Sequence, residues 1–242
     1  MDSEARRLFA DNLTVTRGSR QVLKGISFQV SAGEIYGLLG GNGAGKSTTL
    51  LTILGCISPS SGVIEVDGKG LDSDLAARRQ AIAYLPESAT LYEHLTAREN
   101  LGYFLELAGA SQSDGEIDAT LDQVGLPSTA RDQRLSDYSK GMRQKVAIAL
   151  AILRDTNTLL LDEPTSGLDP RAIDEFHDLA RGLADQGKSV LMVTHDVYGA
   201  CQVADRIGLL KDGQITTEFE ASADSRIDTE AVHRAFTEVA HG

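Results

Sequence analysis

A short glycine-rich loop has the residues needed to hold a phosphate chain. Residues 40–47 read GGNGAGKS and fit the pattern G-x-x-x-x-G-K-[ST], between an apolar run at 34–40 and a helical pattern from Ser47. In such a loop backbone N–H groups surround phosphate oxygens, Lys46 reaches the β- and γ-phosphates, and the Ser47 hydroxyl can bind Mg²⁺. The residues predicted to hold a nucleoside triphosphate here are Gly40, Asn42, Gly43, Ala44, Gly45, Lys46, Ser47 and Thr48.

Two carboxylates and a histidine could supply the rest of the chemistry that transfers a phosphoryl group to water. Asp162 and Glu163 end the apolar run TLLLDEP, and His195 ends the apolar run SVLMVTH. Ligands of α/β folds bind at the carboxyl ends of such strands. We expect Asp162 to hold Mg²⁺, Glu163 to deprotonate the attacking water, and His195 to contact the γ-phosphate and hold that water in line. Lys46 is the third catalytic residue, beside Glu163 and His195.

A second stretch, DYSKGMRQKVAIALAIL at 137–153, has only part of the equipment for binding phosphate. Ser139 is placed to cap a helix that runs to about Leu153, and Gly141 allows close approach of a ligand to the backbone. The stretch has no strand before it and no carboxylate pair of its own. An ordinary capped helix explains these residues taken alone. The ordinary cap is the better explanation on these residues alone. The alternative is a head-to-tail pair of chains, in which Ser139 and Gly141 cover the phosphate held by Lys46 of the other chain.

The composition excludes several classes of protein. The chain has 242 residues and a formal net charge of −12, which repels nucleic acid and anionic lipid, so we expect no nucleic-acid partner. No apolar run approaches the ~20 residues of a membrane-spanning helix, so we expect no direct insertion into a membrane. Cys56 and Cys201 lack metal-site spacing and are predicted to be buried thiols.

The pattern of apolar residues predicts an α/β fold with a helical insert. Short β-type runs and turns fill the first 70 residues, and two almost wholly apolar runs at 158–162 and 189–194, separated by a helical pattern at 172–184, are typical of buried parallel strands. From Asp72 to Arg154 the spacing of apolar residues is helical. We also expect a hairpin at 207–219 that turns at Asp212-Gly213, and a tail that faces the core with Val232, Phe236 and Val239.

Together these motifs make the chain resemble the ATP-binding subunits of ABC transporters along nearly its whole length. The loop GGNGAGKST is similar to the family's Walker A motif, YSKGMRQ to its signature motif, TLLLDEP to Walker B, SGLD at 166–169 to the D-loop, and VTHD to the loop of the switch histidine. The five motifs follow one another in the family's order. The resemblance implies that Asp169, in the D-loop, also belongs to the nucleotide site.

The resemblance further implies an architecture and a set of partners. The expected fold is a RecA-like P-loop NTPase core with an antiparallel β edge and an inserted α-helical subdomain. A single ABC ATPase domain would span 1–242, with the core at 1–87 and 157–220, the helical subdomain at 88–156 and a tail at 221–242. ATP would lie between two ATPase subunits, expected to be two copies of this chain, and its hydrolysis would drive a separately encoded transmembrane permease.

Two positions depart from the family's pattern. The hinge between core and helical subdomain usually carries a glutamine that senses Mg²⁺, and here it carries Glu87, which we expect to bind Mg²⁺ as a carboxylate. The segment from Ser88 to Asn100 would then face the membrane partner. The place of the aromatic residue that usually stacks on adenine holds Arg17, whose planar guanidinium could stack on the base or stay in solvent.

The resulting prediction is an ATPase subunit on the inner, cytoplasmic face of a membrane that energises transport by ATP-driven dimerisation. The wording YSKGM, with a proline-glutamate hinge, is most similar to the ABC-2 exporter branch, which favours export. One rival is a soluble ABC ATPase of translation or DNA repair, which the single set of motifs and the acidic charge disfavour. Another rival is a catalytically silent subunit, in which Glu87 and Arg17 would be signs of a damaged site. The catalytic set argues against it, because it is intact at Lys46, Asp162, Glu163 and His195.

Overall fold

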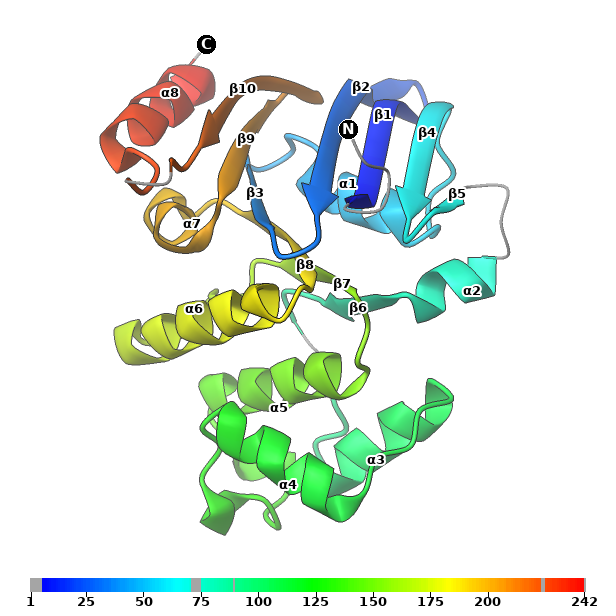
Figure 1. Ribbon diagram of the computed structural model, residues 1–242, viewed down its shortest axis with the longest axis vertical. Helices are drawn as coiled ribbons and strands as arrows, with labels where there is room; N and C mark the ends of the chain where they lie inside the picture. Colours follow the sequence, from blue (N-terminus) through cyan, green and yellow to red (C-terminus); the bar gives the residue numbers. More distant parts are fainter. Residues whose placement is uncertain (1–5, 71–74, 89, 223–224, 242) are drawn as a thin grey trace.

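The described residues form two β-sheets with helices beside them (Figure 1). The computed structural model describes residues 6–70, 75–88, 90–222 and 225–241, with side chains up to Thr237. The larger sheet has the order β10-β9-β3-β8-β7-β6, and its strands are parallel except for the antiparallel pair β9 and β10. Its strands are β3 (Ile35–Leu39), β6 (Ile82–Leu85), β7 (Thr158–Asp162), β8 (Ser189–Thr194), β9 (Arg206–Lys211) and β10 (Gln214–Glu220).

The smaller sheet is antiparallel and has the order β2-β1-β4-β5. Its strands are β1 (Arg6–Arg17), β2 (Arg20–Ser31), β4 (Ser61–Val66) and β5 (Lys69–Gly70). It packs on one face of the larger sheet, where the two share a core with α1 (Lys46–Ile53). The β1–β2 hairpin therefore reaches the loop that precedes α1, and the predicted antiparallel edge is confirmed.

Every residue of β3, β7 and β8 is buried, because both faces of these strands meet apolar side chains. Successive residues point to opposite faces: Leu38 and Leu160 join the core shared with the antiparallel sheet, whereas Leu39 and Leu161 join the core on the helical side. The helices on that side, and the tail, are α3 (Ala97–Leu107), α4 (Asp114–Gln123), α5 (Lys140–Leu153), α6 (Pro170–Asp185), α7 (Val197–Val203) and α8 (Thr229–His241).

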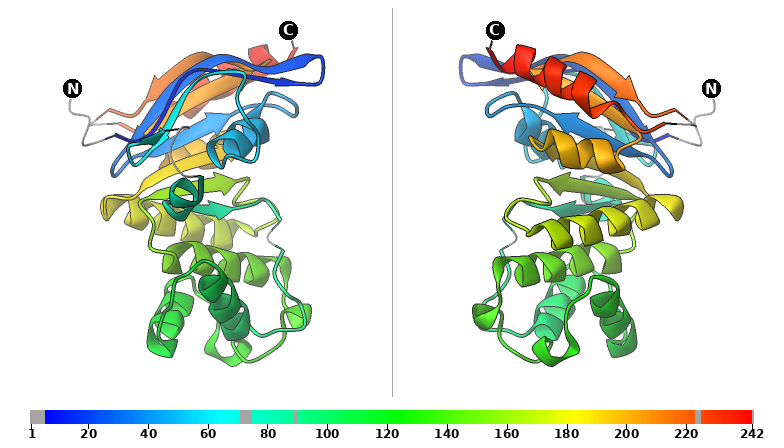
Figure 2. Two further views of the ribbon diagram at one scale, coloured as in Figure 1. Left: turned by 90° about the vertical axis from the view of Figure 1, so that its right-hand side faces the viewer. Right: turned by 90° about the vertical axis from the view of Figure 1, so that its left-hand side faces the viewer.

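The helices α3, α4 and α5 gather at the end of the molecule farthest from the antiparallel sheet, as Figures 1 and 2 both show. At the other end, α8 packs against α7 and β9, with Val232 and Phe236 in contact with the core as predicted. The side chain of Val239 lies outside the described ones. No helix in the described residues is both long enough and apolar enough to cross a bilayer.

Two expectations from the sequence are wrong. The block from Asp72 to Arg154 is not helical throughout, because Ile82–Leu85 forms β6, an edge strand parallel to β7, after the short helix α2 (Leu75–Gln80). A four-residue apolar run next to a helix cannot be told from a helical turn by periodicity. Cys56 is exposed rather than buried, since it follows the end of α1, whereas Cys201 is buried as expected.

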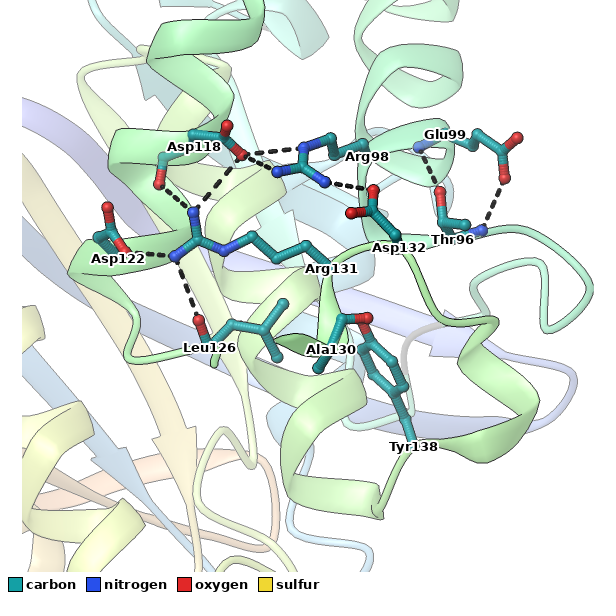
Figure 3. A network of polar contacts seen from close by, with 10 residues as sticks. All are labelled: Thr96, Arg98, Glu99, Asp118, Asp122, Leu126, Ala130, Arg131, Asp132 and Tyr138. Carbon is teal, nitrogen blue, oxygen red and sulfur yellow. Dashed lines mark hydrogen bonds and ion pairs between the residues drawn. The ribbon is translucent and has the colours of Figure 1, made fainter. Parts of the chain in front are cut away.

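The helices α3, α4 and α5 form a layer, called the helical layer below. Two arginines, Arg98 and Arg131, connect its parts, as Figure 3 shows. Arg98 of α3 pairs with Asp118 of α4 at 2.9 Å and also with Asp132. Arg131 is only 4% exposed, pairs with Asp122, and donates hydrogen bonds of 3.3 Å to the backbone carbonyls of Asp118 and Leu126.

The same network fixes the loop that leads to Ser139. Next to Arg131, Ala130 accepts a 2.7 Å hydrogen bond at its carbonyl from the buried hydroxyl of Tyr138, the residue before Ser139. Arg143 donates to the carbonyls of Leu135 and Tyr138. The start of α5 is therefore held by the side chains of Tyr138 and Arg143, which donate to three backbone carbonyls in the loop before it.

We predict that Arg131→Met lowers the free energy of unfolding by about 2 kcal/mol, because it leaves the carbonyls of Asp118 and Leu126 without their donor. Asp122 is well exposed and can be hydrated instead. Urea denaturation of the purified chain measures the loss. Arg171→Met is the control: the Arg171 side chain is 90% exposed in its pair with Glu175, and its loss should change stability by less than about 0.5 kcal/mol. Equal losses in both variants would contradict the network's role.

Candidate active site

The glycine-rich loop joins the end of β3 to the start of α1 and needs glycine at two points for steric reasons. Gly45 caps α1 with φ 119°, and a Cβ there would lie 2.7 Å from Cδ2 of the buried Leu23. A Cβ on Gly40 would lie 2.7 Å from the carbonyl oxygen of Leu210. Around both positions the chain is packed from outside by β2 and β9, so the loop keeps its curled shape.

The inner side of the loop is open. A Cβ built on Gly41 or Gly43 would meet nothing within 4 Å among the described residues. No described side chain caps the first turn of α1, which leaves its N–H groups available to an anion. Asn42 and Ser47 are exposed, and Ala44 accepts a hydrogen bond from the N–H of Gly213 in the β9–β10 turn. The open, donor-rich cradle fits a phosphate group.

Lys46 lies inside this cradle and points back toward it. Its Nζ donates a 2.6 Å hydrogen bond to the carbonyl of Gly40 and a longer one, 3.4 Å, to Gly41. It also lies 3.5 Å from Oε1 of Glu163, and both side chains are almost fully buried. The lysine is thus held by its own loop and by the carboxylate predicted to be the general base.

Glu163 follows the last residue of β7 and is turned toward β8 by an unusual backbone conformation. Its φ is 46°, in the left-handed region that non-glycine residues rarely adopt. Its N–H donates to the carbonyl of Val193 at 2.9 Å. Its Oε2 lies 2.9 Å from the Thr194 hydroxyl, 3.2 Å from the His195 N–H and 2.8 Å from Nδ1 of the His195 ring. The structure therefore brings together Lys46, Glu163 and His195.

The environments of the two neighbouring carboxylates push their pKa values apart. Burial by itself would raise the pKa of Glu163, but the hydrogen bonds from His195 and Thr194 outweigh it and lower that pKa below its ordinary value. Burial raises the pKa of Asp162, the hydrogen bond from Tyr84 opposes the shift, and the charges of Glu163 and Glu87 add to it. Burial and the nearby Asp162 raise the pKa of Tyr84 to about 12. Glu163 is thus favoured as an ionised base.

A cleft of about 300 Å³ connects these residues to solvent. Its walls are the glycine-rich loop, the carboxylates Asp162, Glu163 and Glu87, and the exposed hairpin arginines Arg17 and Arg20. Ser47 and Thr48 lie at its floor, at the start of α1. In the described part of the chain neither Arg17 nor Arg20 has a side-chain hydrogen bond or ion pair, although the two stand opposite each other across the hairpin.

The donor set of the cleft fits Mg²⁺ bound together with phosphate. No three His, Cys, Asp or Glu side chains among the described residues gather closely enough to hold a metal ion by themselves. Ser47, Asp162 and Glu87 offer one hydroxyl and two carboxylates at the same cleft. Mg²⁺ prefers oxygen ligands and usually completes its shell with phosphate oxygens and water, so this incomplete set is suited to an ion that arrives with the nucleotide.

His195 does not line this cleft itself but contacts Glu163, which does. The predicted residues of the signature motif and the D-loop lie on other segments. Ser139 caps α5, and its hydroxyl accepts a hydrogen bond from the Met142 N–H. Gly141 packs near Leu168, where an added Cβ would lie 3.7 Å from Cδ2. Asp169 caps α6 and accepts a hydrogen bond from the N–H of Ala172. The second phosphate motif and the D-loop therefore lie next to each other, away from the chain's own Lys46.

Sequence reasoning missed three residues of the site: Tyr84, Thr194 and Arg20. Tyr84 lies on β6, which the sequence pattern did not reveal, and its hydroxyl lies 3.4 Å from Asp162. Thr194 reads as the last residue of an apolar strand, and only its position directly before His195 could have drawn attention to it. Arg20 follows Gly18 and Ser19 in a turn, and turn residues are commonly solvated.

Comparison with known proteins identifies the family. The family model of the ABC transporter matches residues 23–166, which is more than half of the chain and includes the glycine-rich loop, the helical layer and both carboxylates. The chain belongs to the ABC transporter ATP-binding family. The uncharacterized ABC transporter ATP-binding protein YdbJ of Bacillus subtilis (strain 168) is 35% identical over 226 residues, covering 93% of this chain and 73% of its own length.

Further ABC proteins are similar in sequence and in fold. The Nod factor export ATP-binding protein I of Burkholderia orbicola (strain AU 1054) is 36% identical over 208 residues, 86% of this chain and 68% of its own. A solved ATP-binding subunit of an ABC transporter has a TM-score of 0.82 and 30% identity, covering 96% of this chain and 99% of that one. A dimeric ATP-binding cassette in a post-hydrolysis state with ADP and Pi has a TM-score of 0.79 and 28% identity, covering 88% and 98%.

These similarities confirm three predictions from the sequence. The fold is that of an ABC ATPase, with the P-loop NTPase core described above. The chain is an ATP-binding subunit of the ABC transporter class, and its enzymatic class is that of an ATPase. The dimeric ABC structure also agrees with the expectation that this ATPase works as a dimer.

We predict that Gly45→Ala lowers the free energy of unfolding by about 1 to 3 kcal/mol, because alanine rarely adopts φ 119° and its Cβ would press on Leu23. It should also weaken binding of a fluorescent ATP analogue at least about tenfold, since the cap of α1 must shift. Urea denaturation and a fluorescence titration measure the two effects. Gly41→Ala, at an open position without positive φ, should leave stability within about 0.5 kcal/mol. If Gly45→Ala behaves the same way, the steric account of the loop is wrong.

Proposed function

We propose that the chain is the ATP-hydrolysing subunit of an ABC exporter and that it acts as a head-to-tail dimer beneath a separate transmembrane permease. The observation that carries this proposal is the contact of Glu163 with both Lys46 and His195, where Lys46 and Glu163 line the cleft of the glycine-rich loop and His195 meets Oε2 of Glu163. These are the groups that hydrolysis of a nucleoside triphosphate requires, and they come from three separate segments of the chain.

The proposed reaction is attack of water on the γ-phosphate of ATP. Glu163 takes a proton from the water, the new P–O bond forms, and the bond between the γ-phosphorus and the bridging oxygen breaks, which releases ADP and phosphate. Lys46 and His195 hold the γ-phosphate, and backbone N–H groups of the loop hold the other phosphate groups of ATP. Ser47, Asp162 and Glu87 would hold Mg²⁺, which offsets the negative charge of the phosphates.

The second phosphate motif supports the dimer. Ser139, Gly141 and Asp169 lie outside the chain's own cleft, yet Ser139 is exposed at the start of a helix whose approach is fixed by the network around Arg131. In a head-to-tail pair with two-fold symmetry these residues would close the site on the partner's Lys46. A related cassette has been solved as a dimer with ADP and Pi.

The proposal of export and of a membrane partner rests on relatives. One relative is named for Nod factor export and another for linearmycin resistance. A subunit of this kind would lie on the cytoplasmic face of the membrane and present Ser88–Asn100 to the permease. We assign 1–87 and 157–220 to the core, 88–156 to the helical subdomain and 221–242 to the tail. The net charge of −12 disfavours the alternative role at DNA or ribosomes, because it repels the nucleic-acid backbone.

We predict that Glu163→Gln binds ATP but turns it over about 10²- to 10⁴-fold more slowly than the natural chain, because the amide cannot take a proton from water. With ATP and Mg²⁺ this variant should accumulate as a dimer, which analytical ultracentrifugation detects as a doubling of mass. Without ATP the variant should have the mass of a monomer.

The same measurement tests the shared site. Adding Ser139→Arg to Glu163→Gln should abolish the ATP-dependent dimer, since the bulky cation blocks the partner's phosphate. Ser136→Arg is the matched control, because Ser136 is exposed in the same loop and lies three residues earlier; it should leave the dimer intact. A chain that binds ATP and stays monomeric at all accessible concentrations would remove the homodimer from the proposal.

We predict that Arg17→Ala raises the KM for ATP about threefold or more without changing kcat, because the exposed guanidinium is proposed to stack on adenine. Arg17→Phe keeps a planar face and should keep the KM near that of the natural chain. Arg20→Ala, which removes a second exposed arginine from the same cleft, controls for a general loss of positive charge. Steady-state ATPase assays decide: equal KM values for Arg17→Ala and the natural chain would exclude stacking.

A further inference from the structure

We infer that Thr194 is the positioning residue of the general base, holding the Glu163 carboxylate in place both before and after nucleotide binding. The inference rests on the proposed function, in which Glu163 activates water. It starts from the fact that Oε2 of Glu163 has three donors around it, from the Thr194 hydroxyl, the His195 N–H and the His195 ring.

The groups that donate to Glu163 differ in whether they are also proposed to bind the γ-phosphate. Lys46, at Oε1, and the His195 ring, at Oε2, are the two groups proposed to hold the γ-phosphate. The His195 ring is largely exposed and Lys46 ends a flexible side chain, so both can turn to a phosphate. The Thr194 hydroxyl belongs to the last residue of a buried strand, and Thr194 as a residue is 2% exposed. When the phosphate takes Lys46 and the His195 ring, the Thr194 hydroxyl and the His195 N–H still hold Oε2.

The direction of the Thr194 hydrogen bond is fixed by its other partner. The N–H of Asp196 donates to Thr194 Oγ1 at 3.0 Å, so the hydroxyl proton is left to point at Glu163, 2.9 Å away. Asp196 is itself held as the cap of α7, where its carboxylate accepts from the Gly199 N–H at 3.0 Å. The hydroxyl is therefore an oriented donor to an ionised acceptor, which is the stronger kind of hydrogen bond.

Thr194 also connects the base to the phosphate loop. Its carbonyl accepts a 3.3 Å hydrogen bond from the N–H of Gly40, the first glycine of the loop. The strands β3 and β8 are in register at this level, with Leu39 opposite Thr194. A single buried residue thus links the loop through its backbone and the general base through its side chain, and fixes the distance between the two.

The test compares Thr194→Val, which keeps the shape of the side chain and removes the hydroxyl, with Thr194→Ser, which keeps the hydroxyl. Steady-state ATPase kinetics should show kcat about 10- to 100-fold lower for Thr194→Val, the range expected for losing a hydrogen bond to a charged group. The KM for ATP and the affinity for a fluorescent ATP analogue should be unchanged, which also shows that the variant is folded. Thr194→Ser should restore most of kcat.

The outcomes separate this inference from the proposed function. If Glu163→Gln is inactive and Thr194→Val keeps the natural kcat, Glu163 remains the base and only the role of Thr194 is overturned. If Thr194→Ser is as slow as Thr194→Val, the effect comes from packing of the side chain and the inference is overturned as well. If Glu163→Gln turns over ATP at the natural rate, the base itself is wrongly assigned, and both statements fall.

Discussion

The parallel register of β3, β8 and β7 is the constraint on which the rest of the site depends. Leu39 stands opposite Thr194, and Val193 stands opposite Asp162, so the three strands end at one level. The glycine-rich loop, the switch histidine and the carboxylates all begin there. A shift of one residue in any pair would turn its side chains to the other face. Apolar packing on both faces of the sheet prevents that shift, so the core determines where the polar groups lie.

The charges gathered at this edge partly compensate one another. Two buried carboxylates and one buried lysine would be costly to desolvate separately, and the Lys46–Glu163 pair and the hydrogen bonds to Glu163 reduce that cost. Asp162 keeps a larger desolvation cost, because burial raises its pKa and its carboxylate has, among the described residues, only the long hydrogen bond from Tyr84. A poorly satisfied buried carboxylate is suited to a cation. When Lys46 turns from Glu163 to a phosphate, the Thr194 hydroxyl and the His195 N–H remain as hydrogen-bond donors to the Glu163 carboxylate.

The sequence predicted the parts of the site that depend on local patterns. The loop at 40–47, the carboxylates after β7, His195 after β8 and the Ser139 cap each carry their signal within a few residues. The role of Thr194 was not predictable in this way, because it depends on strand register and on the Asp196 N–H, which only the folded chain brings together. Tyr84 was missed with β6, since four apolar residues between a helix and a proline have no decisive period. Cys56 was placed wrongly because composition says nothing about where a helix ends.

Glu87 lies where the chain passes from the cleft to the helices α3, α4 and α5. Glu87 follows β6 by two residues and lies in the cleft close enough to Asp162 to raise its pKa. After it the chain leaves the sheet and enters the segment before α3, whose Arg98 belongs to the ion-pair network that holds the approach to Ser139. Because Arg98 and Arg131 tie α3, α4 and the residues at 130–132 together, the chain that leaves the cleft at Glu87 enters the same packed layer from which α5 and its cap Ser139 begin.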